Sequence, residues 1–405
     1  MMENDTFIPE DWVPGNNAIK VLGVGGAGQN AVTYMFNNRI EGCTFVICNT
    51  DGQALKSSAV PIKIHIGKKR GAGCDPIKGR NAAEEDIAEI HEKVLGPETE
   101  MLFITAGMGG GTGTGASPVI AAAARKKGIL TVGVVTLPFR NEGRNSLSRA
   151  MDGIRELEKY VDSLLIIDNE KLYTVYGDML AEEAYPKVNQ VLATAVQSIL
   201  GIIQKVGDQN VDMEDVKTII KDSGLAIMGI GTAKGEDRLR EAVNSAVVLP
   251  LMNSLDMHSA KNMLVNIVSG RGENGVKMRD LQEVDNLIES YIGGANKFKR
   301  GLVYEDEITD GTVSITIIAT GFKPDLLNSI SDETLGNIIH LGADYEYAPE
   351  PVETVNEVSV KMIGPNDSRN EPIFHFDKAP LLSTYTNATI AKLENVSAIT
   401  RLKMN

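Results

Sequence analysis

A run of glycine and threonine residues from Gly109 to Gly115 (GGGTGTG) is the part of the sequence best suited to bind phosphate. It follows the apolar run MLFIT and precedes a segment of helical periodicity in which Pro118 suits the first turn. A glycine-rich turn between a buried strand and a helix presents backbone N–H groups, and the helix dipole adds to their attraction for an anion. A linker would also be rich in glycine, but linkers are not enclosed between strand and helix patterns. The run therefore predicts a phosphate-binding loop.

A second glycine loop follows the first apolar run of the chain. The run IKVLGV leads into GVGGAGQNAV, where Gly25, Gly26 and Gly28 let the backbone approach a phosphate. Alone this loop is ambiguous, because NAD-binding folds use the same spacing and Asp51 lies at a suitable distance downstream to bind a ribose. A dinucleotide fold has no use for a second loop, whereas two such loops on one sheet edge can surround a triphosphate. A triphosphate site is therefore favoured, and a dehydrogenase is the weaker alternative.

Other nucleotide-binding and catalytic patterns are absent or weaker. No G-x-x-x-x-G-K-[ST] motif occurs, which sets aside the P-loop class. The turn Gly71-Ala72-Gly73 also offers backbone donors, although an ordinary turn has the same composition. The five histidines are scattered and form no H-E-x-x-H motif, so we expect no rival catalytic set.

Two carboxylates could act on a phosphate held by these loops. Asp212 and Asp215 stand just ahead of the helical run VKTIIKD, where carboxylates cap a helix and complement its dipole. Hydrolysis of a γ-phosphate needs an oriented water and charge neutralisation, for which carboxylates are suited. From the residues alone, a capping role and a catalytic role stay equally open.

The elements around the loops predict an α/β fold. From Ile19 to about Ile167, the short runs IKVLGV, TFVICN, MLFIT, LTVGVV and SLLII alternate with helix-patterned stretches. Repeated strand–helix order predicts a doubly wound, Rossmann-like parallel sheet whose ligands lie at the carboxyl ends of the strands. The glycine loops fall at those ends.

The rest of the chain predicts a long helix, a second domain and a tail. Apolar residues recur at helical spacing from Val188 to Ile203, and Pro186 suits the first turn of this helix. Strand and helix patterns then resume, as LAIMGIG, NMLVNIVS, FKRGLVY and TVSITIIAT with helices between them, which predicts a smaller α+β domain. The proline-rich remainder reads as mostly unstructured, although IAKLENVSAITRLKM at its end could bind a partner groove or be a frayed terminus. We expect an N-terminal extension (1–17), a nucleotide-binding domain with the long helix (18–206), the α+β domain (207–322) and the tail (323–405).

Composition limits the partners. The chain has 405 residues and a formal net charge of -14, and it shows no basic cluster, so nucleic acid is an unlikely partner. Three cysteines at irregular spacing match neither a disulfide framework nor a zinc site and suit a reducing cytoplasm. No apolar run is long enough to cross a bilayer, and the start of the chain is acidic where a signal peptide would be basic, so we expect a soluble protein that is not exported.

The motifs resemble one known family. GGGTGTG is the signature loop of the tubulin superfamily, and ITAGMGGGTGTGASPVI, ILTVGVVTLPF, NTDGQAL and GAGCDPIKGRNAAEEDI resemble FtsZ, the family of bacterial division proteins. The likeness runs from about Ile19 to Gly321. It includes Gly207 to Asp215, which matches the G-x-x-N-x-D-x-x-D loop of that family. The resemblance implies a GTPase that polymerises head to tail into the filaments of the division ring.

The resemblance also implies site residues. Asn210, Asp212 and Asp215 would enter the nucleotide pocket of the next subunit, where the acids polarise water or hold an associated cation such as Mg²⁺. The nucleotide-binding set that follows from the matched motifs is Gly25, Gly26, Ala27, Gly28, Gln29, Asn30, Asn49, Gly71, Ala72, Gly73, Gly109, Gly110, Gly111, Thr112, Gly113, Thr114, Pro138, Glu142, Ser146, Tyr185, Asn189 and Gln190. No protein metal site is expected, and GTP or GDP is the expected ligand.

Three residues of this set depart from the family pattern. Ser146 stands where a basic residue is expected, although Arg140, Arg144 or Arg149 could reach the same sugar and phosphate. Gln190 stands where an aspartate usually reads guanine, and a glutamine meets the guanine edge less well. Gln29 replaces a glycine and adds a side chain where backbone normally approaches phosphate.

The departures leave a second function open, a co-assembling nucleotide-binding scaffold that hydrolyses little. For either function we expect the protein in the cytoplasm at the mid-cell division site. The expected partners are further copies of the chain and division-ring proteins, some of them through the tail. The tail lacks the usual acidic-proline-apolar terminal peptide of the family, so contact with the membrane is expected only through tethers.

Overall fold

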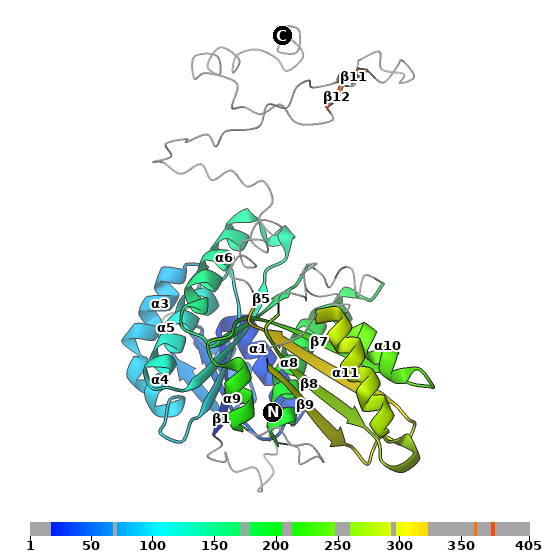
Figure 1. The fold of residues 1–405 in the computed structure, drawn as a ribbon. Coiled ribbons are helices and arrows are strands. Elements are labelled where there is room, and N and C mark those ends of the chain that lie inside the picture. The colour runs from blue at the N-terminus through cyan, green and yellow to red at the C-terminus, as the bar shows by residue number, and fades with distance from the viewer. Residues whose placement is uncertain are drawn as a thin grey trace, which may run out of the picture. The chain divides into compact units, whose positions relative to one another are not determined.

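The fold is known from a computed structural model (Figure 1), which describes residues 18–67, 71–170, 173, 178–204, 213–247, 260–292, 297–322, 360–362 and 374–376. The chain forms two compact units, Met1–Ile338 and Ile339–Asn405. The candidate site lies in the first unit. Within the described residues, no helix combines the length and the hydropathy needed to cross a membrane.

A ten-stranded sheet forms the centre of the first unit, in the order β3-β2-β1-β4-β5-β6-β7-β10-β8-β9. The strands from β3 to β7 are parallel to their neighbours, β10 is antiparallel to β7 and β8, and β9 is parallel to β8. The strand bounds are β1 Ile19–Val24, β2 Thr44–Asn49, β3 Ile62–His65, β4 Met101–Gly107, β5 Leu130–Leu137, β6 Ser163–Asp168, β7 Gly224–Ala233, β8 Asn262–Ser269, β9 Lys297–Tyr304 and β10 Val313–Thr320.

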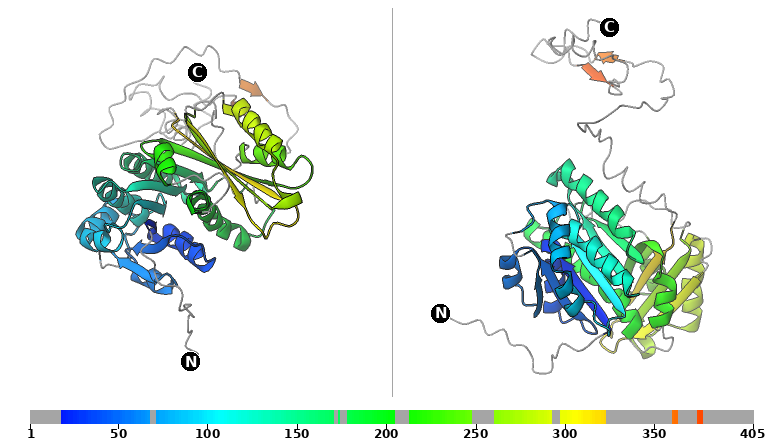
Figure 2. Two further views of the ribbon diagram at one scale, coloured as in Figure 1. Left: turned by 60° about the horizontal axis from the view of Figure 1, so that its bottom comes forward. Right: turned by 90° about the vertical axis from the view of Figure 1, so that its left-hand side faces the viewer.

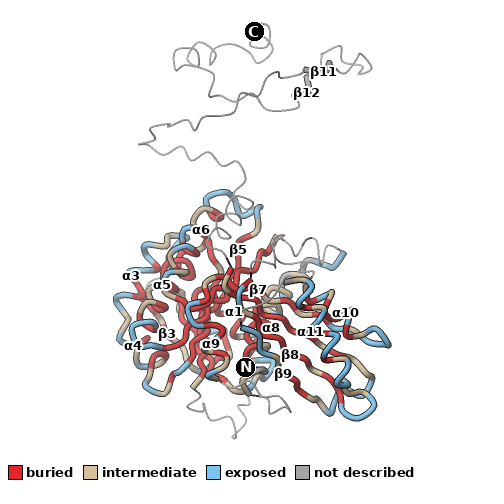
Figure 3. The backbone as a smooth tube through the Cα atoms, in the orientation of Figure 1, coloured by how far each residue is buried: buried red, intermediate tan, exposed pale blue. Residues whose placement is uncertain are grey.

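Helices cover both faces of the parallel part of the sheet. Alternate residues of β1 face opposite ways, so that Val21 joins the core beneath α1 and α8 while Leu22 joins the core beneath α3 to α6. This two-sided burial explains why the strands read as continuous apolar runs (Figure 3). The helix bounds are α1 Gly25–Asn37, α2 Gly52–Ser57, α3 Pro76–Glu85, α4 Ile87–Lys93, α5 Thr112–Lys126, α6 Arg144–Glu158, α8 Ala181–Gln204 and α9 Met213–Ile220, with a short 3₁₀ helix η1 at Arg140–Glu142.

The C-terminal part of the sheet has its own core. Helices α10 (Arg238–Val247) and α11 (Met278–Ile292) pack on β7, β8 and β10 through a third apolar cluster (Figure 2). A 3₁₀ helix, η3, occupies Gly272–Asn274. Because Leu164 of β6 pairs with Leu225 of β7, the sheet continues from the N-terminal, parallel half into the C-terminal half.

The predicted elements agree with the structure in type, with three differences. Strand β3 was not predicted, because IKIH is short and only Ile64 is buried. Helix α8 begins at Ala181, before the expected start, and contains Pro186 in its interior. In the second unit, β11 (Val360–Met362) and β12 (Phe374–Phe376) pair antiparallel, in the tail that we expected to be mostly unstructured. The terminal run from 390 to 403 lies outside the described residues.

Candidate nucleotide-binding site

The two glycine loops meet where the order of the sheet reverses. Strand β1 has β2 on one side and β4 on the other, so the loops after β1 and β4 lie side by side at the carboxyl edge. Gly25 has φ +72°, and a β-carbon there would lie 2.9 Å from the amide nitrogen of Gly113. The loops predicted from sequence therefore touch, and only glycine at position 25 allows this approach.

The helices that begin at these loops lack side-chain caps. No side chain caps α1 or α5 within the described part of the chain, whereas Asp51 accepts from Gln53 N at 2.8 Å to cap α2 and Asp75 accepts from Ile77 N at 3.0 Å to cap α3. The first-turn amides of an uncapped helix are available to an anion. Asp51 therefore has a capping role that is independent of the ribose contact assigned to it by the dehydrogenase alternative.

Two hydrogen bonds fix the backbone of the signature loop at Gly109. Gly109 adopts φ +101°, its N–H donates to Thr114 Oγ1 at 2.9 Å, and its carbonyl accepts from Arg149 Nε at 2.9 Å. At Gly110, no atom of the described residues beyond the local chain lies within 4 Å of the position of a β-carbon. The same holds at Gly26, in the opposite loop. Within the part of the chain that the structure describes, both loops thus border open space rather than packed side chains.

The third turn joins the other two. Gly71 and Gly73 have φ +75° and +61° and border open space in the described structure, while Ala72 packs against Gly111. Thr50 connects the loops, because its carbonyl accepts from Gly71 N at 3.2 Å and its hydroxyl bonds Thr112 Oγ1 at 2.7 Å. Sequence reasoning missed Thr50, although its place after Asn49 at the carboxyl end of β2 could have indicated it.

Gln29 differs from its expected placement. Its side chain is only 4% exposed, its Nε2 donates to Ala54 O at 2.5 Å, and its Oε1 accepts from Asn49 Nδ2 at 3.0 Å. The glutamine therefore connects α1 to the segment after β2 and does not project into the space at Gly26. These hydrogen bonds direct the side chain away from the space in which we expected it to crowd a phosphate.

Predicted contacts for the sugar and the base lie on two further elements. Pro138 and the buried Ser146 both lie against Gly109, and Glu142 accepts from Phe139 N at 3.0 Å. On α8, Asn189 is half-buried, and the exposed Gln190 accepts from Lys187 Nζ at 3.0 Å. The side chain of Tyr185 lies outside the described part of the structure.

The predicted acid loop is described only in part. Asn210 and Asp212 lie outside the described residues. Asp215 lies in the first turn of α9 and forms an ion pair with Lys299 at 2.6 Å. The helix is anchored by Val216 and Ile219, which are buried in the same core as α1 and α8.

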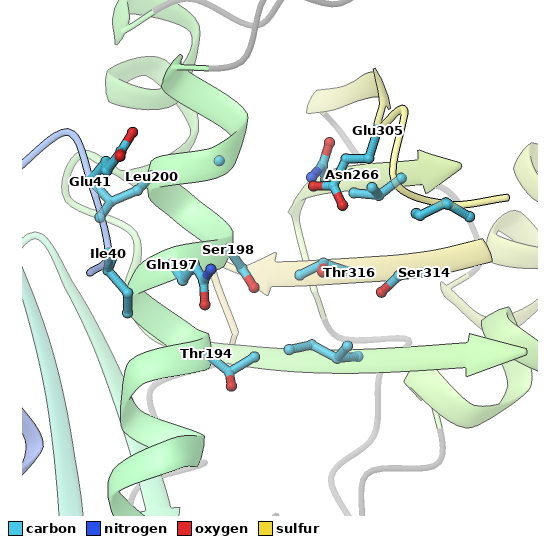
Figure 4. A pocket seen from close by; sticks show the side chains of 14 residues that line it. Ile40, Glu41, Thr194, Gln197, Ser198, Leu200, Asn266, Glu305, Ser314 and Thr316 are labelled. Carbon is cyan, nitrogen blue, oxygen red and sulfur yellow. The ribbon is translucent and has the colours of Figure 1, made fainter. Parts of the chain in front are cut away.

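A separate cavity of about 490 Å³ lies between α8 and the C-terminal strands (Figure 4). Thr194, Gln197 and Ser198 face it from α8, and Asn266, Ser314 and Thr316 from the sheet. None of its lining residues belongs to the glycine loops, so it is distinct from the candidate nucleotide site. Among the described residues, no group of three or more His, Cys, Asp or Glu side chains is placed to hold a metal.

Comparison with known proteins agrees with this geometry. The model of the Tubulin/FtsZ family, GTPase domain, matches residues 18–177, and that of the FtsZ family, C-terminal domain, matches residues 224–323. The cell division protein FtsZ of Azotobacter vinelandii is 44% identical over 332 residues, which cover 80% of this chain and 83% of that protein. The FtsZ of Porphyromonas gingivalis is 39% identical over 346 residues, or 84% of this chain and 74% of that protein. A solved structure, an empty FtsZ dimer from M. jannaschii, is similar with a TM-score of 0.69 and 37% identity over 75% of this chain and 88% of that one. With two family models matched in order and this identity over most of its length, the chain belongs to the tubulin/FtsZ family.

Proposed function

We propose that this GTPase binds GTP between its three loops and hydrolyses it when a second copy docks head to tail, in filaments that act at the division site. The observation that carries the proposal is the meeting of the loops around Gly26, Gly71, Gly73 and Gly110, where the described residues leave open space. Backbone amides and two uncapped helix ends border this space, an arrangement suited to a chain of phosphates.

The position of Asp215 supports action on a neighbouring subunit. Helix α9 is joined to the amino-terminal end of the parallel strands, because Lys217 contacts Glu100 at 3.2 Å, just before β4 begins (Figure 1). The signature loop follows the other end of β4. A strand of seven residues spans about 20 Å, so Asp215 lies too far from the nucleotide site of its own chain. A head-to-tail contact would place this carboxylate, together with Asp212 and Asn210, at the site of the next copy.

The chemistry follows from this division of roles. The loops bind and orient the triphosphate, while the carboxylates of the next subunit orient a water molecule for attack on the γ-phosphate. Mg²⁺ bound to the phosphates would neutralise their charge. Because magnesium keeps several waters and takes ligands from phosphates, such binding does not need a cluster of protein ligands. Hydrolysis would then depend on assembly, and an unassembled chain would turn over slowly.

Sedimentation and phosphate release, followed in the same tubes with GTP, ATP or no nucleotide, test the proposal. We expect pelleting and phosphate release only with GTP, and both should begin above one threshold protein concentration. Phosphate release that stays proportional to protein concentration, with no threshold, would contradict assembly-dependent hydrolysis.

The second candidate is a scaffold that binds nucleotide and co-assembles but hydrolyses little. Gln190 motivates it, because this residue stands at the position expected to read guanine and its oxygen already accepts from Lys187. Comparing the turnover of the wild type with that of Asp212→Ala separates the two functions, because a scaffold has little turnover to lose. Division-ring proteins are the expected partners in both cases, some of them through the tail.

A further inference from the structure

Arg149 contacts the signature loop from outside the glycine motifs. It lies on α6, one turn after Ser146, and its half-buried side chain donates from Nε to the carbonyl oxygen of Gly109 at 2.9 Å. Ser146 is too short to reach past Gly109, against which it packs: a β-carbon at Gly109 would lie 2.6 Å from Ser146 Oγ. The guanidinium thus approaches the loop from position 149, while the expected position, 146, holds a small side chain.

The bond from Arg149 fixes the direction of a peptide group. The peptide between Gly109 and Gly110 is planar and trans, so its C=O and N–H point in opposite directions. With the carbonyl bound to Arg149, the Gly110 N–H points away from the arginine. The N–H of Gly109 is bound to Thr114 Oγ1, which leaves this glycine no polar group free to rotate. Without Arg149, a glycine at φ +101° could rotate and turn its carbonyl dipole toward a phosphate.

We propose that Arg149 is a positioning residue for the β- and γ-phosphates: it keeps the Gly109 carbonyl turned away from them and brings a positive charge to the loop that position 146 does not supply. The inference rests on the proposed function, because it requires a triphosphate at these loops. On this inference, the orientation of the signature loop depends on Arg149, which contacts the loop backbone at Gly109.

Binding to unassembled protein tests the inference, because it does not involve the acids of a neighbouring copy. Fluorescent GTP and GMP would be titrated below the assembly threshold, at equal salt, into the wild type, Arg149→Met and Arg149→Lys. We expect Arg149→Met to weaken GTP binding about tenfold, as loss of a charge-assisted hydrogen bond does, and to leave GMP binding nearly unchanged. Arg149→Lys keeps the charge without the fixed guanidinium, so its GTP affinity should lie between those of the wild type and Arg149→Met.

Two further variants complete the test. Arg155→Met, two turns further along the same helix, removes an exposed arginine paired with Asp152 at 3.8 Å and should bind both nucleotides as the wild type does. Ser146→Arg in the Arg149→Met background should restore part of the GTP affinity, because it returns a guanidinium to the neighbouring turn.

The ratio of GTP to GMP affinity decides the outcome. Equal losses for GTP and GMP would show that Arg149 only supports the fold, and unchanged GTP affinity in Arg149→Met would show that the loop does not need it. Either result overturns the inference. A wild type that binds no GTP would instead overturn the proposed function, so the two failures are distinguishable.

Discussion

Asp215 Oδ1 and Lys299 Nζ lie 2.6 Å apart, which joins the first turn of α9 to β9, the edge strand of the sheet. The side chain of Lys299 is 48% exposed and that of Asp215 is 27% exposed, so the pair is reachable from a docking surface. A carboxylate proposed to act on the next subunit is thus held by a cation of its own chain.

Two substitutions separate the carboxylate from its partner. We expect Asp215→Asn to lower the assembly-dependent phosphate release about a hundredfold, in the range of a lost general base, with nucleotide binding unchanged. Lys299→Gln removes the cation that holds Asp215 and should therefore raise phosphate release. The rise should be no more than about fivefold, because a partly exposed ion pair contributes at most about 1 kcal/mol. Phosphate release above the assembly threshold measures both. If Lys299→Gln proved as damaging as Asp215→Asn, Lys299 would itself have to contact the nucleotide.

Glycine-to-alanine substitutions distinguish open from packed positions. Gly26→Ala and Gly110→Ala add a methyl group that meets no described side chain, so we expect an unchanged unfolding temperature but about tenfold weaker GTP binding, from crowding of the phosphates. Gly113→Ala places its methyl group 2.5 Å from the Gly107 carbonyl, so it should destabilise the fold by about 1–3 kcal/mol. Thermal unfolding without nucleotide, followed by a GTP titration, measures both effects. Full GTP affinity in the two open-position variants would place the phosphates elsewhere.

The cysteines differ in reactivity because of burial. Cys74, beside Gly73, is exposed, whereas burial raises the pKa of the Cys43 thiol from 9.0 to about 12 and also raises the pKa of Cys48. We expect iodoacetamide near neutral pH to modify Cys74 alone in the native protein, and GTP to slow that reaction. Peptide mass spectrometry measures both. Equal rates with and without GTP would contradict the placement of the third turn at the nucleotide.

The raised pKa of Cys43 also predicts a pH dependence of stability. Because the Cys43 thiol ionises less readily in the folded chain than in the unfolded chain, alkaline pH favours unfolding. With respect to Cys43, the folded chain is at its full stability below pH 9.0, where the thiol is protonated in both states, and it loses stability as the pH rises from 9.0 toward about 12. The unfolding temperature should therefore fall over this range, and less steeply in Cys43→Ala. An equal slope in the two proteins would assign the alkaline instability to other groups.

The sequence predicted what depends on local chemistry and missed what depends on contacts between distant segments. The glycine loops were found because only glycine suits φ values such as that of Gly109, and strands such as β1 were found because both faces are buried. No local pattern places Thr50 against Thr112 or Asp215 against Lys299, since each pair is joined only when the sheet forms. The direction of the Gln29 side chain depends in the same way on Ala54.

For Gln29, the sequence and the structure predict opposite effects of a substitution. If its side chain crowded the phosphates, as its position in the glycine loop suggests, Gln29→Gly would tighten GTP binding. In the structure the side chain is buried and bonded to Ala54 O and Asn49 Nδ2, so its removal leaves both groups without this partner. We therefore expect Gln29→Gly to lower the free energy of unfolding by about 1–3 kcal/mol and to weaken GTP binding, because α1 and the segment after β2 lose their connection. Gln53→Gly, at an exposed position of α2, is the matched control and should leave GTP affinity unchanged. Denaturant unfolding without nucleotide and a GTP titration of folded protein measure the two effects, and tighter GTP binding by Gln29→Gly would show that the glutamine opposes the phosphates after all.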